Sequence, residues 1–119
     1  MSRIVITGAA GFIGSAVAKK LIRKGHKIVT IDNLSTGQKK FLNKALKNKN
    51  FELKNSNILD IDSLEGLDEV DTVYHLAGQP GVQTSWGSGF ETHLDRNVLT
   101  TQRLLEECLE KSVRRVVIA

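Results

Sequence analysis

Residues 5–14 read Val-Ile-Thr-Gly-Ala-Ala-Gly-Phe-Ile-Gly, and this stretch decides the fold. It begins inside a short apolar run, residues 3–7, of the kind that forms a strand covered on both faces of a parallel sheet. Three glycines follow at G-x-x-G-x-x-G spacing, and apolar residues then recur at helical spacing until Gly25 ends the pattern. A second apolar run, residues 27–32, closes on an acidic residue. This order of elements predicts the first unit of an α/β fold with a parallel sheet.

The glycines also indicate what kind of ligand this turn can bind. A diphosphate binds at a helix N-terminus because unpaired N–H groups point at it and the helix dipole favours negative charge. Gly8 would make the tight turn, Gly11 would let the backbone approach the phosphates, and Gly14 would let the helix pack on the first strand. Phe12 and Ile13 would offer backbone N–H groups while their side chains enter the core. The alternative is a structural turn whose glycines bind nothing.

Asp32 lies 18 residues after Gly14, at the end of the second apolar run. At that place a carboxylate accepts hydrogen bonds from the hydroxyls of an adenosine ribose and repels a 2′-phosphate, which favours NAD over NADP. Lys39 and Lys40 follow closely enough to keep NADP open. The alternative for Asp32 is a turn or helix-capping residue.

Three further strands are expected, at residues 51–53, 71–76 and 115–119, and a long helix at residues 90–111. With right-handed crossovers the predicted class is a doubly wound parallel sheet of about five strands in the order 3-2-1-4-5. The inner stripe of the long helix is expected to consist of Leu94, Val98, Leu105, Cys108 and Leu109.

Composition narrows the classes of function. The chain has 119 residues, enough for one domain, and a net charge of +4 whose lysines we assign to solvent-facing helix surfaces. Aromatic residues that could stack on nucleic-acid bases are few, so we expect no nucleic-acid partner. No apolar run reaches the roughly 20 residues of a membrane span, and we expect a cytoplasmic protein without membrane contact. The single Cys108 excludes an internal disulfide, and we expect a buried thiol and no metal site.

These motifs, together with Asp-Asn-Leu-Ser-Thr-Gly at 32–37, Tyr-His-Leu-Ala-Gly at 74–78 and Asn-Val at 97–98, resemble the extended short-chain dehydrogenase/reductase family. Within it, the chain is most similar to the NAD-dependent nucleotide-sugar epimerases and dehydratases, above all the UDP-glucose (UDP-galactose) 4-epimerases. The resemblance covers essentially all 119 residues. It implies an incomplete Rossmann-like fold, NAD as cofactor, and a nucleotide sugar as substrate of the parent enzyme.

The resemblance also implies further cofactor contacts. At the adenosine end these are the loop residues Asn33, Ser35, Thr36, Gly37, Asn57 and Ile58. Asn57 stands where the family usually has Asp, so its contact to the adenine amino group loses charge assistance.

Leu76, Ala77 and Gly78 match the loop that passes beneath the cofactor ribose and pyrophosphate in this family. Asn97 matches the asparagine of the helix that backs the active site. His75 invites a catalytic interpretation, but the resemblance favours a packing role at the end of the strand.

The family's catalytic Ser/Thr and Tyr-x-x-x-Lys pair have no counterpart in this chain. The only tyrosine, Tyr74, falls within an expected strand, and Gly78 stands four residues later. We therefore assign no catalytic residue and interpret residues 1–119 as one NAD-binding domain, truncated and without its substrate domain. A stand-alone dinucleotide-binding module and a folding unit that binds nothing remain alternatives. Self-association is expected through the fifth-strand edge or the long helix.

Overall fold

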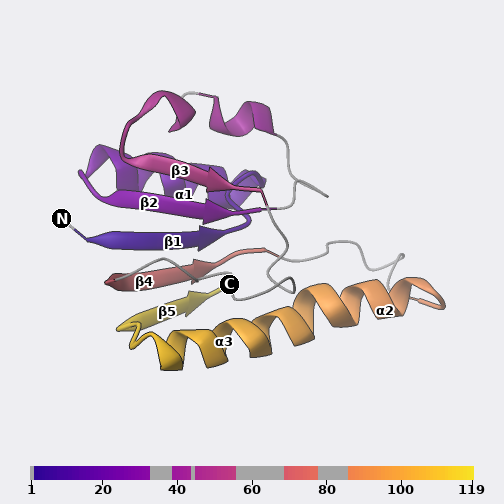
Figure 1. Cartoon of the computed structure of the whole chain (residues 1–119). Helices are drawn as coiled ribbons and strands as arrows, with labels where there is room; N and C mark the ends of the chain where they lie inside the picture. Colours follow the sequence, from indigo (N-terminus) through magenta and orange to yellow (C-terminus); the bar gives the residue numbers. More distant parts are fainter. Residues whose placement is uncertain (1, 33–38, 44, 56–68, 78–85) are drawn as a thin grey trace.

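The computed structural model describes residues 2–32, 39–43, 45–55, 69–77 and 86–119 (Figure 1). In these residues the strands β1 to β5 form one five-stranded parallel sheet in the order β3-β2-β1-β4-β5. Their bounds are Arg3–Thr7, Lys27–Ile31, Phe51–Lys54, Val70–His75 and Arg115–Ile118. The predicted α/β class and strand order are confirmed.

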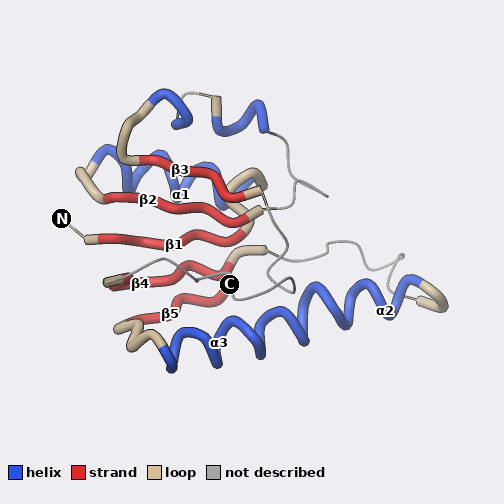
Figure 2. Tube along the Cα trace, viewed as in Figure 1, coloured by secondary structure: helices blue, strands red, loops and turns tan. Residues whose placement is uncertain are grey.

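Helices cover the two faces of the sheet. Helix α1 (Phe12–Arg23) follows β1, and the short 3-10 helices Lys39–Leu42 and Ala45–Lys47 precede β3. Beyond residue 86 come α2 (Gly89–His93), a π-helical turn (Leu94–Leu99) and α3 (Thr100–Glu110), which Figure 2 shows as one long helix beside β4 and β5. None of the helices in the described ranges combines the length and the apolar character that crossing a bilayer requires.

The core has two layers because successive residues of a strand point to opposite faces. Ile4 and Ile6 of β1 pack on the face covered by α1, in a cluster that also contains Ala18. Val5 packs on the opposite face with Leu104 and Cys108 of α3. Burial on both faces explains why β1 and β2 read as nearly continuous apolar runs.

The predicted inner stripe of the long helix was wrong except at Cys108. The sheet contacts a narrow face of α3 at spacing i, i+4, i+8, made by the buried Thr100, Leu104 and Cys108. The other predicted members are exposed: Leu94 by 42%, Val98 by 61%, Leu105 by 37% and Leu109 by 82%. Two features explain the error: the π turn shifts the helical register, and the apolar surface of this helix is wider than the sheet beneath it.

Candidate functional site

The strand order reverses direction between β1 and β4, which are paired neighbours in the sheet. In open α/β sheets, ligands bind outside the carboxyl ends of the strands at such a switch point. We call this side, where Thr7, Ile31 and His75 end β1, β2 and β4, the carboxyl edge. The segment after β1 starts at Gly8, and the segment after β4 starts at Leu76, so both lie at this edge.

Gly8 occupies a conformation and a space that only glycine fits. Its φ is +76°, in the left-handed region. A Cβ at Gly8 would lie 2.7 Å from the nitrogen and 2.8 Å from the Cα of Ala77. Its N–H donates to the carbonyl of Ile31 across 3.0 Å, which ties the turn to the end of β2. The turn therefore lies between the end of β2 and the segment after β4, on the two sides of β1.

Gly14 is required for the contact between α1 and the turn. A methyl group there would overlap with the carbonyl oxygen of Gly8 and lie 2.9 Å from the Cα of Ala9. Gly11 differs, because the one described heavy atom within 4 Å of its added Cβ is the Gly8 oxygen, at 3.3 Å. Packing within the described chain thus explains Gly8 and Gly14, whereas at Gly11 the same packing leaves room for a methyl group.

The N-terminus of α1 presents its first amides at this edge. Gly11 is the N-cap residue, with an extended backbone and no side-chain cap, and the first turn contains no acidic residue. The Ser15 N–H donates to the Gly11 carbonyl across 3.0 Å and so begins the intrahelical ladder. The amides of Phe12, Ile13 and Gly14 precede that bond and have no carbonyl one turn earlier in the helix. This arrangement suits an anion.

The side chains of Phe12 and Ile13 do not enter the core, contrary to our expectation. They are 84% and 62% exposed, and the buried residues of α1 are Gly14, Ser15 and Ala18. Because Gly14 must face the turn, the two preceding positions are rotated away from the sheet by the helical period of 3.6 residues. The backbone roles expected for these two residues do not depend on where their side chains point.

Asp32 is brought to the same turn. It follows β2, and its Oδ2 accepts a hydrogen bond from the Ala10 N–H across 3.0 Å. Its own N–H donates to the carbonyl of Lys54 across 3.2 Å, so the backbone at Asp32 still belongs to the β2–β3 ladder. The carboxylate and the glycine turn, 22 residues apart in sequence, therefore share one place in the structure. Seven other predicted site residues lie outside the described ranges: Asn33, Ser35, Thr36, Gly37, Asn57, Ile58 and Gly78.

Leu76 and Ala77 are held by a residue that our sequence analysis missed. Both backbone N–H groups donate to Oγ1 of Thr7 across 3.1 Å. Thr7 is fully buried at the end of β1, and nothing in a short apolar run distinguishes it as more than a β-branched strand residue.

His75 is 3% exposed, which agrees with the expected packing role, but it is also hydrogen bonded on both sides. Its Nδ1 lies 2.7 Å from Thr7 Oγ1, and its Nε2 lies 2.8 Å from Thr101 Oγ1. Burial lowers the pKa of the imidazole below its ordinary value, because the charged form loses hydration. Asn97 is exposed on the π turn, and its carbonyl accepts a hydrogen bond from the Thr101 hydroxyl across 2.7 Å.

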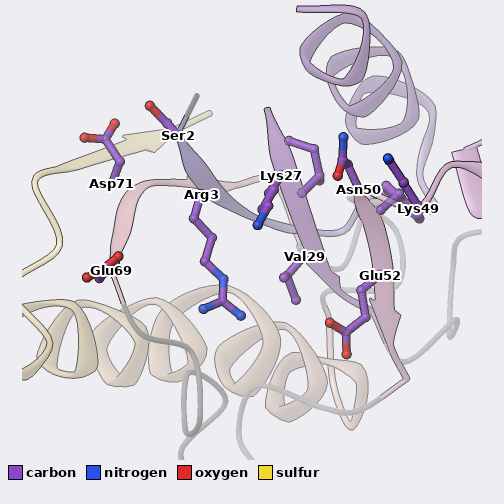
Figure 3. Close-up of a pocket in the computed structure, with 11 residues that line it drawn as sticks. Ser2, Arg3, Lys27, Val29, Lys49, Asn50, Glu52, Glu69 and Asp71 are labelled. Atoms are coloured by element: carbon purple, nitrogen blue, oxygen red, sulfur yellow. The ribbon is translucent and has the colours of Figure 1, made fainter. Parts of the chain in front are cut away.

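A hollow of about 790 Å³ lies at the opposite side of the sheet, where the strands begin, which we call the amino edge (Figure 3). Its charged lining residues are Arg3, Lys27, Lys49, Glu52, Glu69 and Asp71. The three cationic and three carboxylate groups of this lining balance in charge. Its chemistry does not suit a dinucleotide, so its size does not make it the candidate site.

The fold and the geometry at the carboxyl edge are those of the Rossmann-like α/β domains. The family model described as "NAD dependent epimerase/dehydratase family" matches residues 4–119, and the chain belongs to this family.

An uncharacterized UDP-glucose epimerase, YtcB, of Bacillus subtilis is 38% identical, over 98% of this chain and 39% of the relative. The UDP-glucose 4-epimerase of Mycolicibacterium smegmatis is 37% identical, over 97% of this chain and 37% of the relative. The chain thus spans well under half the length of these curated relatives. Among solved structures, the UDP-glucuronic acid 4-epimerase of Bacillus cereus in complex with UDP-glucuronic acid and NAD superposes with a TM-score of 0.90 at 34% identity, over 98% of this chain and 39% of that structure.

Proposed function

We propose that residues 1–119 form a single domain that binds NAD and supplies the cofactor site of a nucleotide-sugar epimerase. The observation that carries this proposal is the hydrogen bond between the Ala10 N–H and the Asp32 carboxylate, which joins the glycine turn and the acid at the switch point. Family membership and the NAD-containing structure of a relative support the choice of cofactor.

Different described residues would bind different parts of NAD. The amides of Phe12 and Ile13 would bind the diphosphate, which reaches them because Gly11 has no side chain. Asp32 would accept hydrogen bonds from the adenosine ribose, and Leu76 and Ala77 would lie beneath the central part of the cofactor. The assigned contacts outside the described ranges, and Asn97 near the nicotinamide end, belong to the same proposal. Bound NAD would supply a hydride acceptor for a sugar carbon.

For the parent enzyme we propose the interconversion of UDP-glucose and UDP-galactose at carbon 4, with a nucleotide sugar as substrate. The names of the two curated relatives support this reaction. We propose that the catalytic Ser/Thr, Tyr and Lys are supplied outside these 119 residues, so this chain alone would bind the cofactor without turnover. A cytoplasmic location, typical of the family, is part of the same proposal.

Calorimetric titration of the chain with NAD tests the proposal. We expect saturable binding that weakens by at least about tenfold in Gly11→Ala, because the added methyl group occupies the path of the diphosphate. The fold should survive, since φ at Gly11 is −79° and the methyl group meets one atom at 3.3 Å. Absence of saturable binding at millimolar NAD, or equal affinity in wild type and Gly11→Ala, would contradict the assignment. UDP-galactose should not be turned over by this chain.

We also propose that the chain self-associates, through its long helix or through the edge of β5. Phe90 is 57% exposed and Val98 61% exposed on the helix, and Ile118 is 54% exposed on β5. Sedimentation should show concentration-dependent association. Val98→Asp should abolish it if the helix is the interface, whereas Ile118→Asp should abolish it if the strand edge is. A monomer at all concentrations would refute both.

A further inference from the structure

A continuous line of hydrogen bonds runs beneath the candidate site, from the loop after β4 to the π turn. The amides of Leu76 and Ala77 donate to Thr7 Oγ1, which lies 2.7 Å from His75 Nδ1. On the other side of the ring, Nε2 lies 2.8 Å from Thr101 Oγ1, and the Thr101 hydroxyl donates to the carbonyl of Asn97. We call this line the His75 relay.

Counting donors and acceptors places every hydrogen in the relay. A threonine hydroxyl has two lone pairs and one hydrogen. Oγ1 of Thr7 accepts two backbone N–H groups, and that of Leu76 is shared with the Thr7 carbonyl oxygen at 3.2 Å. With both lone pairs of Oγ1 engaged, its hydrogen donates to Nδ1 of His75. Nδ1 is then without a proton, and the neutral ring carries its hydrogen on Nε2, which donates to Thr101. The Thr101 hydrogen is committed to the Asn97 carbonyl.

Protonation of His75 does not fit this arrangement. A hydrogen on Nδ1 would point at an oxygen whose lone pairs are already used, and the Thr7 hydrogen would lose its acceptor. The opposite neutral tautomer fails for the same reason.

The relay joins segments that lie at the candidate site. Ala77, whose N–H is held by Thr7, supplies the nitrogen that a Cβ at Gly8 would approach to 2.7 Å. At the other end, the hydroxyls of Thr101 and Thr100 donate to the carbonyls of Asn97 and Asp95, both within the π turn. π turns inside α-helices occur frequently at functional sites.

We propose that His75, held as the neutral Nε2–H tautomer, is a positioning residue for the candidate cofactor site: it fixes the Leu76–Ala77 segment and the Asn97 turn relative to Gly8. The assignment of this site to NAD rests on the proposed function, whereas the relay itself does not. A purely space-filling role is a poorer account, because an apolar side chain of similar size would leave the Thr7 and Thr101 hydroxyls without these partners.

The first test is the tautomer, read from the ring nitrogens of His75 by nitrogen-15 NMR at neutral pH on the 119-residue chain. We expect Nδ1 to have the shift of an unprotonated nitrogen and Nε2 that of a protonated one. The Nδ1–H tautomer, or a charged ring, would overturn the proposal.

The second test asks whether a change at Thr101 alters the backbone environment of Leu76 and Ala77 through the relay. Thr101→Val removes one hydroxyl at the helix, and Thr101→Ser keeps it. We expect the Val variant, but not the Ser variant, to shift the amide signals of Leu76 and Ala77, which Thr101 does not contact through the backbone. Thr30→Val is the matched control, since Thr30 is a buried strand residue whose hydroxyl donates to the Glu52 carbonyl, away from the relay. Shifts confined to the neighbourhood of residue 101 in the Val variant would overturn the proposal.

The third test is NAD affinity. Thr101→Val should weaken it by about fivefold, and Thr101→Ser should restore it to within about twofold of wild type. If wild type binds NAD and Thr101→Val binds it equally well, the positioning role is refuted. If wild type does not bind NAD, the proposed function fails for this chain, while the two NMR tests still decide whether the relay exists and transmits.

Discussion

The carboxyl edge of the sheet, which carries the candidate site, and the amino edge, which carries the hollow of Figure 3, are built in opposite ways. At the carboxyl edge the backbone packs against itself so closely that Gly8 and Gly14 admit no side chain. At the amino edge, charged side chains of both signs surround open space. A diphosphate site is made of accessible backbone amides on a rigid turn, so tight packing identifies it better than the volume of a hollow does.

The largest expected difference between the two edges is the loss of stability when a glycine is replaced by alanine. Gly14→Ala places a methyl group 2.8 Å from the carbonyl carbon of Gly8, and backbone must move to accommodate it. We expect the free energy of unfolding to fall by more than about 3 kcal/mol. Gly25, in the turn before β2 at the amino edge, also has a positive φ of +86°, but a Cβ there meets no described atom within 4 Å. Gly25→Ala should therefore cost only about 1 kcal/mol, from backbone conformation alone.

Chemical denaturation of the two variants measures this difference. Equal losses of stability in the two variants would mean that close contact with neighbouring backbone is not what makes glycine necessary at position 14.

The next expected effect is on NAD affinity. Asp32→Asn keeps an oxygen that can accept the Ala10 N–H but removes the charge, so affinity for NAD should fall by about tenfold with little loss of stability. Discrimination against NADP should narrow, because the repulsion of a 2′-phosphate disappears. Glu52→Gln removes an exposed carboxylate that lines the hollow at the amino edge, and it should leave both affinities unchanged. Calorimetry with each nucleotide checks this, and a comparable loss in both variants would point to general electrostatics.

A smaller effect is expected from pH at the carboxyl edge. The pKa of His75 is lowered by burial, so below about pH 6.5 the unfolded chain binds a proton at this residue while the native chain does not. The contribution of His75 to the free energy of unfolding is thus fully present above that pH and is lost as the pH falls toward the native pKa. The free energy of unfolding should fall by up to about 1.4 kcal/mol per pH unit there, and His75→Gln should lack this component. Identical pH profiles for the two proteins would show that His75 does not titrate as described.

The effect of least consequence for the candidate site concerns Cys108, near the end of α3 that leads to the amino edge. Burial, with the charge of Glu107, raises the pKa of its thiol to about 11. At pH 8 only about a thousandth of such a thiol is ionised, so a water-soluble disulfide reagent should modify the folded chain far more slowly than the denatured chain. Equal rates would mean that α3 does not protect the thiol.

Burial shifts the two groups in opposite directions for one reason. Low polarity disfavours the charged form, which is the protonated form for histidine and the deprotonated form for cysteine.

Most of the fold could be predicted because its signals are local. Apolar runs bounded by glycines and polar residues mark each strand, and the alternation of strands with helices leads to the order 3-2-1-4-5. The glycine turn and the acid after the second strand were also recognisable, because their spacing follows from the geometry of one βαβ unit.

The predictions of side-chain burial failed where burial depends on contacts with residues distant in sequence. Whether Phe12 and Ile13 are buried depends on which face of α1 Gly14 turns toward the sheet. The buried face of α3 depends on how much sheet lies beneath it and on the π turn before it.

The chain of 119 amino acids alone established the strands, their order, the glycine turn and the acid expected to face it, because hydrophobic period and turn chemistry act over a few residues. Tertiary structure alone decided that Thr7, His75 and Thr101 form one hydrogen-bonded line. These partners are 68 and 26 residues apart, and a buried polar group acquires its role only from the groups that folding places within reach.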